Sequence, residues 1–388
     1  MGTNGAGSAN KLTGMNRRTN KNRPVSTNRL TRKDGRLITN RRGVLLAAIF
    51  CAAASLAFVA AVDAQRRDAR TKSPHAAQSP PAARAGGEAR RVAVTFDDLP
   101  MTGDGGRSSG EQVAENLKKI AETLKANDVP AIGFVNENKL EAPGQREART
   151  DALRAWLDAG FDLGNHTYSH RSFYRTPLAA FEQEVIKGEP VTKQLLAERG
   201  KSLRYFRHPF LNTGRTLADK RAFEKFLAAR GYEVAPVTVD NSEWVFAQAY
   251  SDAIRGGDDA KRRRLAAEYA PYMETMFEFY ERLSRDLFKR EIPQVLLVHA
   301  NQLNGDHFAE IVSMLKARGY SFITLDEALA DPAYRSSDGY VGDVGVSWLQ
   351  RWRVTRGQAF RPEPPLPEYA RRFDADIRGA SFKTRAER

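Results

Sequence analysis

The sequence predicts an α/β fold in which parallel strands form a closed or nearly closed barrel. Short apolar segments alternate with segments of helical spacing from residue 91 to about residue 330. About seven strand units occur, and this number favours a barrel over an open sheet. The polar residues best suited to catalysis or metal binding each stand at the carboxyl end of an expected strand. Active sites of parallel α/β folds form at that edge.

The expected elements alternate in chain order. Strands are expected at 91–98 (RVAVTFDD), 131–135 (AIGFV), 161–166 (FDLGNH), 205–210 (YFRHPF), 233–240 (EVAPVTVD), 294–300 (QVLLVHA) and 321–325 (SFITL). Helices are expected at 110–127, 145–159, 177–199, 216–230, about 250–290 and 306–318. The first helix has Val113, Leu117, Ile120 and Leu124 on one apolar stripe. We expect the barrel to occupy residues 91–330.

The segments outside the barrel predict an exported protein that is periplasmic, secreted or anchored facing outward. Residues 1–64 are a basic leader that ends in the uncharged run Gly43–Val62, which suits a signal peptide or a membrane anchor. Residues 65–90 have almost no large apolar side chains and predict a disordered linker. Residues 331–388 form a C-terminal extension, whose Trp348 and Trp352 we expect to pack against the barrel.

The net charge of +14 does not indicate a nucleic-acid partner. Residues 1–64 hold 11 Lys and Arg against only Asp34 and Asp63, whereas the remaining 324 residues hold 50 basic and 45 acidic side chains. The basic excess therefore belongs mostly to the leader. The single cysteine, Cys51, lies in the apolar run, so the exported part has no disulfide.

Two acids and two histidines predict a catalytic metal centre. Asp97 and Asp98 follow the first strand, while His166 and His170 follow the third and stand four residues apart, as on one turn of a helix. Two histidines and one carboxylate leave coordination positions open for water and substrate, which is typical of a catalytic site. Zinc is the first choice of divalent metal in an exported protein, and the ligand types leave cobalt, nickel and manganese open. The second carboxylate is a candidate base.

Three further strand ends supply candidate partners for hydrolysis. Arg207 could keep the base ionised and fix its direction. His299 could protonate a leaving group, and Asp240 could hold that imidazole in one tautomer.

The series TFDD, HTYSH, RHPF, DNSEW and LVH, in that order, resembles the polysaccharide deacetylases with a NodB homology domain, carbohydrate esterase family 4. The resemblance covers about residues 91–329. It implies a distorted (β/α)7 barrel and metal-dependent removal of acetyl groups, mostly N-acetyl, from a carbohydrate or cell-envelope polysaccharide. It also implies a role for each matching residue: Asp97 as base; Asp98, His166 and His170 as metal ligands; Arg207 as the group that positions the base; Asp240 and His299 as the orienting acid and the general acid; and Pro209, Phe210 (through its backbone N–H), Trp244 and Leu297 as substrate-binding residues.

The sequence departs from this pattern at two sites and leaves two other functions open. Leu99 and Pro100 stand where the family usually has Gly, and Glu243 stands where it often has Asp. The helical insertion at about 250–290 contains the aromatic cluster 272–280, which we expect to be helix core. One alternative is a glycosidase on a similar barrel, which would use two carboxylates and no metal. The other is a non-catalytic glycan-binding envelope protein.

Overall fold

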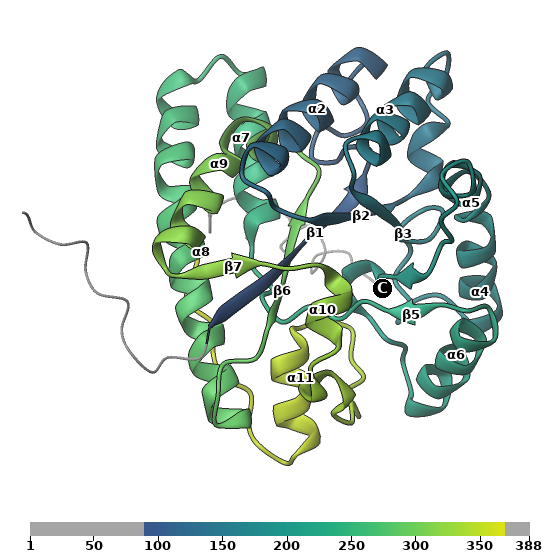
Figure 1. The fold of residues 1–388 in the computed structure, drawn as a ribbon, viewed down its shortest axis with the longest axis vertical. Helices are drawn as coiled ribbons and strands as arrows, with labels where there is room; N and C mark the ends of the chain where they lie inside the picture. Colours follow the sequence, from purple (N-terminus) through teal and green to yellow (C-terminus); the bar gives the residue numbers. More distant parts are fainter. Residues whose placement is uncertain (1–88, 369–388) are drawn as a thin grey trace, which may run out of the picture. The chain divides into compact units, whose positions relative to one another are not determined.

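A computed structural model describes residues 89–368. Its parallel sheet has the strand order β5–β4–β3–β2–β1–β6, and β7 pairs with the first residues of β1 (Figure 1). The strands are β1 (Arg90–Leu99), β2 (Ala131–Val135), β3 (Asp162–Asn165), β4 (Tyr205–Phe206), β5 (Glu233–Val234), β6 (Gln294–His299) and β7 (Tyr320–Phe322). A parallel bridge between Val239 and Leu296 joins the chain after β5 to β6 and closes the ring. The predicted distorted (β/α)7 barrel is therefore confirmed.

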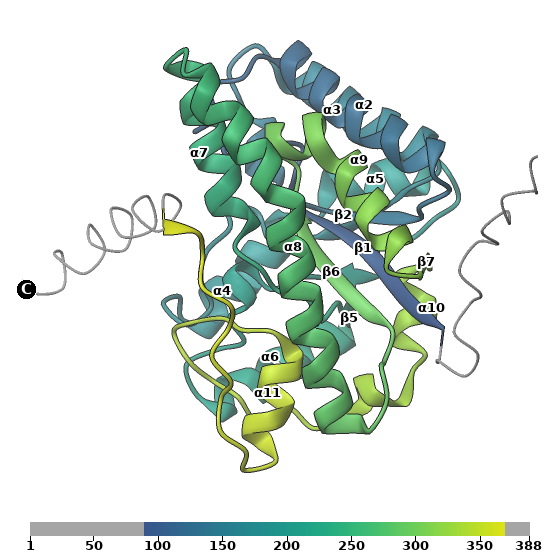
Figure 2. The ribbon, with the colours of Figure 1, turned by 90° about the vertical axis from the view of Figure 1, so that its left-hand side faces the viewer.

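Helices surround this sheet (Figures 1 and 2). They are α2 (Gly110–Ala126), α3 (Arg146–Asp158), α4 (Leu178–Lys187), α5 (Pro190–Ala197), α6 (Leu217–Ala229), α7 (Glu243–Arg255), α8 (Asp259–Phe288), α9 (Gln302–Ala317), α10 (Leu325–Leu329) and α11 (Trp348–Thr355), with short 3₁₀ turns η1 (Glu137–Leu140), η2 (Pro209–Leu211) and η3 (Pro332–Arg335). None of the helices within residues 89–368 is both long enough and apolar enough to cross a bilayer.

Most expected elements are present, and prolines and glycines explain the main differences. The helix expected at 177–199 is two helices, because Pro190 starts a new one at α5. The insertion expected at about 250–290 begins earlier and is also two helices, α7 and α8, which are separated by Gly256 and Gly257. β4 and β5 are only two residues long, since Pro209 and Pro236 follow closely and cannot donate to a strand ladder.

Side chains alternate between two cores along the strands. Val92, Val94 and Phe96 of β1 belong to the large core between the sheet and the helices. Ala93 belongs to the small core inside the barrel, which α10 covers through Leu325. Thr95 and Asp97 have the same parity as Ala93, so the inner face of β1 changes from apolar to polar towards its carboxyl end. The strand period therefore places Asp97 at the inner rim.

The C-terminal extension packs against the barrel as expected. Trp348 and Trp352 are buried in α11, and the Trp352 ring lies 5.6 Å from that of Phe288 in α8. The aromatic cluster 272–280 is buried along α8, which confirms it as helix core. The predicted leader (1–64), nearly all of the linker (65–90) and the last twenty residues of the extension lie outside the described residues.

Candidate metal centre and active site

The polar side chains of β1 and β6 face each other across neighbouring strand ends. Thr95 pairs with Leu297 and Asp97 pairs with His299 in the parallel register. All four have the inward parity, so Asp97 and His299 reach the same end of the barrel interior. The candidate base and the candidate acid are thus brought together by strand register alone.

Asp98 reaches the same rim because the end of β1 is irregular. The register with β2 shifts between Phe96 and Leu99, and Asp98 has a φ of 69°. This left-handed conformation is costly for a residue with a side chain and is typical of functional sites. Positive φ values recur around the site, at Asp98, Thr167, His170, Phe210 and Leu211.

His166 and His170 are brought together by a loop and not by the helical turn that their spacing suggested. Residues 166–170 are non-helical, and the two ring centroids lie 4.9 Å apart. The loop is held by the Thr167 N–H, which donates to Asn165 Oδ1 (2.7 Å), and by the His170 N–H, which donates to Thr167 Oγ1 (3.2 Å). These side-chain oxygens accept hydrogen bonds from backbone N–H groups in a bend and so take the place of the hydrogen bonds of a helix.

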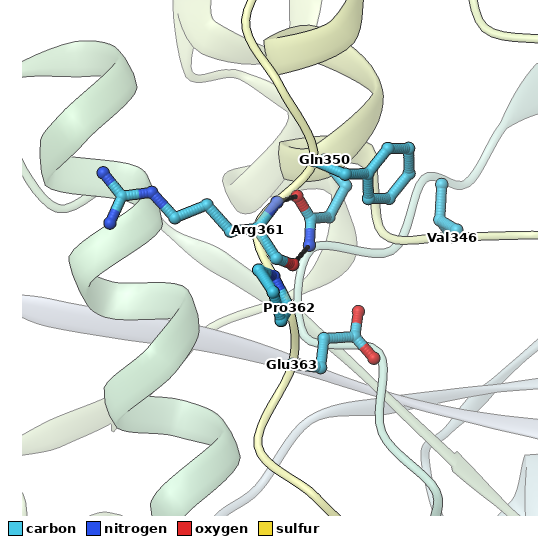
Figure 3. Close-up of a pocket in the computed structure, with 6 residues that line it drawn as sticks. Val346, Gln350, Arg361, Pro362 and Glu363 are labelled. Atoms are coloured by element: carbon cyan, nitrogen blue, oxygen red, sulfur yellow. Dashed lines mark hydrogen bonds between the residues drawn. The ribbon is translucent and has the colours of Figure 1, made fainter.

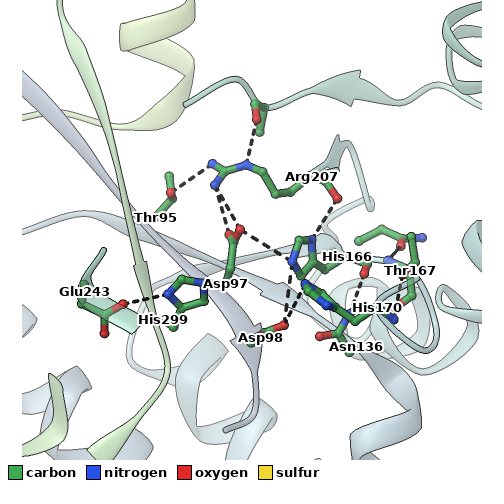
Figure 4. A network of polar contacts seen from close by, with 12 residues as sticks. Thr95, Asp97, Asp98, Asn136, His166, Thr167, His170, Arg207, Glu243 and His299 are labelled. Carbon is green, nitrogen blue, oxygen red and sulfur yellow. Dashed lines mark hydrogen bonds and ion pairs between the residues drawn. The ribbon is translucent and has the colours of Figure 1, made fainter. Parts of the chain in front are cut away.

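Three side chains offer a site that fits a divalent metal. One ligand atom from each of Asp98, His166 and His170 lies within 4.8 Å of the others. Asp98 Oδ1 is 3.5 Å from His170 Nε2 and 3.8 Å from His166 Nε2 (Figure 4). Tetrahedral zinc ligands at about 2.1 Å from the ion would be about 3.4 Å apart, so small shifts would suffice. Asp98 Oδ1 is buried; its contact with Lys139 Nζ at 3.2 Å is an ion pair without hydrogen-bond geometry, so among the described residues it accepts no hydrogen bond.

The protonation states of these side chains also suit a metal. His166 Nδ1 donates to the Arg207 carbonyl at 2.9 Å, which leaves the lone pair on Nε2, the nitrogen that lies 3.6 Å from Asp97 Oδ2 and 3.8 Å from Asp98 Oδ1. Burial lowers the pKa of His166 well below its usual value and also lowers the pKa of His170. Burial acts to raise the pKa of Asp98, but nearby positive charge, that of Lys139 foremost, outweighs it and holds this pKa well below the usual range. Neutral imidazoles and an ionised carboxylate are the ligand forms that a metal requires.

Arg207 contacts Asp97, as the resemblance implies. Its Nη1 lies 3.1 Å and 3.3 Å from the two carboxylate oxygens of Asp97, and its Nη2 and Nε donate to Thr95 Oγ1 and the Ala235 carbonyl (Figure 4). Arg207 is fully buried, so the ion pair is shielded from water. Burial nevertheless raises the pKa of Asp97 to about 6, against the opposing charges of Arg207 and His299. A carboxylate with this pKa is ionised at neutral pH and can accept a proton.

The side chain bonded to His299 is Glu243, and the prediction that Asp240 orients this imidazole is wrong. His299 Nδ1 lies 2.8 Å from Glu243 Oε2. Glu243 is fully buried at the start of α7, and its Oε1 accepts from the amides of Asn301 and of Asn304, the latter at 2.7 Å. Helix α7 begins three residues after Asp240, and the first turn of α7, which carries Glu243, faces the end of β6. Burial acts to lower the pKa of His299, but the bond to Glu243 and the nearby carboxylates raise it to about 9.

Asp240 instead faces the C-terminal extension. Its Oδ1 accepts from the Asn241 N–H at 2.9 Å. Burial, and then the charge of Glu363, raises its pKa to about 7. Gln350 holds this part of the extension through two hydrogen bonds to the Arg361 backbone, at 2.6 Å and 3.2 Å, beside Glu363 (Figure 3). The extension therefore contributes a carboxylate, that of Glu363, near the end of the fifth strand segment, 233–240.

The expected substrate-binding residues differ in exposure. Phe210 is 56% exposed and its ring centroid lies 4.4 Å from that of His170. Trp244 is 37% exposed at the start of α7, so both aromatic rings are open to a ligand. Pro209 and Leu297 are buried and shape the loop and the barrel wall beneath them. Leu99, at the first departure from the family pattern, is buried against Gly133.

Comparisons with known proteins find similar sequences and structures. Residues 84–225 match the sequence model described as polysaccharide deacetylase. The matched residues, which include the first half of the barrel, therefore resemble the polysaccharide deacetylase family. A curated relative, the peptidoglycan-N-acetylglucosamine deacetylase of Bacillus cereus, is 25% identical over 154 residues. That match covers 39% of this chain and 46% of the relative, so the chain spans about half the length of the relative.

Solved structures match part of the chain at low TM-scores. A family 4 carbohydrate esterase from Streptomyces lividans in complex with acetate has a TM-score of 0.38 at 20% identity, over 62% of this chain and 95% of its own. A CE4 family pseudoenzyme from Bacillus anthracis has a TM-score of 0.39 at 16% identity, over 62% of this chain and 67% of its own.

Sequence reasoning missed two residues of this site. Glu243 was noted as a departure, but no role was assigned to it, and the only signal for its role is its place next to Trp244. Lys139 lies 3.2 Å from Asp98 Oδ1 and comes from η1, a turn after β2 that has no strand-end signal. Both residues lie in the first turn of a helix that follows a strand. Hydrophobic periodicity does not predict the direction of a side chain at such a position.

Proposed function

We propose that this protein is a metal-dependent deacetylase that hydrolyses acetyl groups, most readily N-acetyl groups, on a carbohydrate or cell-envelope polysaccharide. The observation that carries the proposal is the joint placement of a buried carboxylate–histidine–histidine set beside a second, Arg-bound carboxylate and a protonated histidine. The match of residues 84–225 to the polysaccharide deacetylase family and the deacetylase activity of the Bacillus cereus relative support the same reaction.

The side chains divide the chemistry of amide hydrolysis among them. Asp98, His166 and His170 would hold the cation, which we propose to be zinc and which would lower the pKa of water and polarise the acetyl carbonyl. Asp97 accepts the proton of the attacking water, with Arg207 fixing its direction. His299, protonated and held by Glu243, donates a proton to the departing amine. The Phe210 N–H donates to the developing oxyanion.

The exposed rings and the leader supply the remaining parts of the proposal. Phe210 and Trp244 offer apolar faces on which sugar rings stack. An acetylated polysaccharide outside the cell agrees with the export signal expected in residues 1–64, which also provides for a membrane tether. We therefore propose an exported enzyme that acts at the cell envelope and has no nucleic-acid partner.

Acetate release from a panel of acetylated glycans, with chelator and with metal added back, tests this function. We expect release that chelator abolishes and zinc restores, and no release from D97N. A glycosidase would produce new reducing ends and would keep its activity in chelator. A non-catalytic glycan-binding protein would bind the panel equally well as wild type and as D97N, with no acetate from either. Either result would overturn the proposal.

A further inference from the structure

A lysine ammonium lies against the carboxylate of the candidate metal centre. Lys139 Nζ is 3.2 Å from Asp98 Oδ1 and 3.1 Å from the Asp98 carbonyl oxygen. It is closer to Oδ1 than either imidazole nitrogen of the same set, His170 Nε2 at 3.5 Å or His166 Nε2 at 3.8 Å. The oxygen that would bind a metal is therefore already paired with a positive charge.

The backbone holds Lys139 in this place. The Lys139 carbonyl accepts from Arg149 Nη1 at 3.0 Å. One residue earlier, the Asn138 N–H donates to the Tyr168 carbonyl at 3.1 Å, in the loop that carries the histidines. Glu137 is buried and accepts from the Thr192 N–H at 2.8 Å. Three successive residues of η1 are thus tied to three other parts of the fold, so the lysine side chain extends from a fixed base.

The charges of the site are balanced before any metal binds. Arg207 pairs with Asp97 at 3.1 Å, and Lys139 pairs with Asp98 at 3.2 Å. Histidine binds a metal as the neutral imidazole, so the two histidines add no charge to the ligand set. A divalent cation would therefore enter a site of zero net charge, and it would compete with the ammonium for Asp98 Oδ1. A site of the same ligands without the lysine would carry a charge of −1 and attract the cation more strongly.

We propose that Lys139 is a built-in cation that competes with the metal for Asp98, so that it weakens metal binding and stabilises the metal-free protein. The inference rests on the metal centre of the proposed function. The Asp98 carbonyl offers the ammonium a second acceptor that it can keep when the carboxylate turns to the metal. The expected consequence is a reversible metal site, loaded according to the free concentration of the cation.

Zinc affinity without substrate tests this role. Metal-free wild type, K139M, K139Q and K118M are titrated with zinc in competition with a chromophoric chelator. K139M keeps the length of the side chain and removes its charge, while K139Q keeps a donor for the Asp98 carbonyl. Lys118 is the matched control, because it also lies near carboxylates, Glu115 and Glu122, but is 62% exposed on α2. Cobalt absorption, with H166A as the blank, reports that the ion occupies the histidine site.

We expect K139M and K139Q to bind zinc about tenfold or more tightly than wild type, and K118M to bind as wild type does. We also expect the metal-free K139 variants to melt at a lower temperature than the metal-free wild type, with a smaller difference after zinc saturation. Equal or weaker zinc binding by both K139 variants would overturn the role of Lys139 and leave the proposed function standing. Absence of zinc binding by wild type and all variants would overturn the metal centre and this inference together.

Discussion

His299 Nδ1 lies 2.8 Å from Glu243 Oε2, and the carboxylate is held from its other side by Asn301 and Asn304. This buried arrangement fixes the imidazole and, despite the opposing effect of burial, raises its pKa to about 9. His299 is therefore an imidazolium at neutral pH, the form that can donate a proton to a leaving group.

The pH dependence of acetate release tests this pair. Because the active form of His299 is protonated, kcat should fall as the pH rises through about 9. E243Q removes the charge that stabilises the imidazolium, so the fall should begin at a lower pH. D240N is the matched control, since Asp240 makes no hydrogen bond to His299 within residues 89–368 and acts on it only through its charge, so that its loss should displace the alkaline limb less than E243Q does. An equal displacement of the limb in both variants would contradict the assignment of Glu243.

The same interaction predicts how stability depends on pH. The pKa of His299 is about 9 in the folded protein against an ordinary value of 6.5, so the folded state binds the proton more tightly. The resulting stabilisation is complete below about pH 6.5 and is lost as the pH rises through about 9. Urea unfolding across this pH range should show a decline in the free energy of unfolding of wild type. E243Q should show a smaller decline. Parallel curves for the two proteins would argue against the bond.

Arg207 should matter for stability as well as for activity. R207M leaves Asp97 as an unpaired charge in a fully buried setting, which should cost about 3–5 kcal/mol in the free energy of unfolding. R199M removes an ion pair to Asp158, which is 64% exposed, and should cost about 1 kcal/mol or less. Chemical denaturation at neutral pH measures both, and comparable losses would contradict the buried role of Arg207.

Gly345 of the C-terminal extension packs closely against the backbone of the loop that carries Phe210. A Cβ at this position would lie 1.7 Å from the Phe210 carbonyl oxygen, so G345A must displace one of the two segments. We expect kcat to fall about 10- to 100-fold with zinc affinity unchanged, because the Phe210 loop carries a donor and not a metal ligand. G339A lies in the same extension, where a Cβ would make only ordinary contacts with Thr355 at 3.5 Å, and should retain activity. Equal kcat values for the two variants would contradict this coupling.

The fold and much of the site could be predicted because both follow from strand periodicity. The expected strand 131–135 has the same bounds as β2 in the structure. Asp97, Arg207 and His299 reach the rim of the barrel because every second residue of a strand points inward. Asp98 reaches the same rim through a local irregularity of β1, which the alternation of side chains along a strand does not predict.

The remaining parts depend on how chain segments turn after each strand. Asp240 and Glu243 stand in one short segment, and only the start of α7 decides which of them meets His299. The spacing of His166 and His170 suits a helical turn, yet local side-chain bonds hold a bend there. Lys139 reaches Asp98 from a 3₁₀ turn whose position depends on contacts with α3 and with the segment 190–192, which no local pattern reveals.

Zinc titration of the metal-free protein, with acetate release from an N-acetylated glycan as the readout, tests the central claim most directly. The claim is that Asp98, His166 and His170 together hold one cation that the reaction requires. The account predicts no release without metal, a rise that saturates at one zinc per chain, and no rise in H166A. Equal rates of acetate release in chelator and in zinc, or full activation of H166A by zinc, would contradict it.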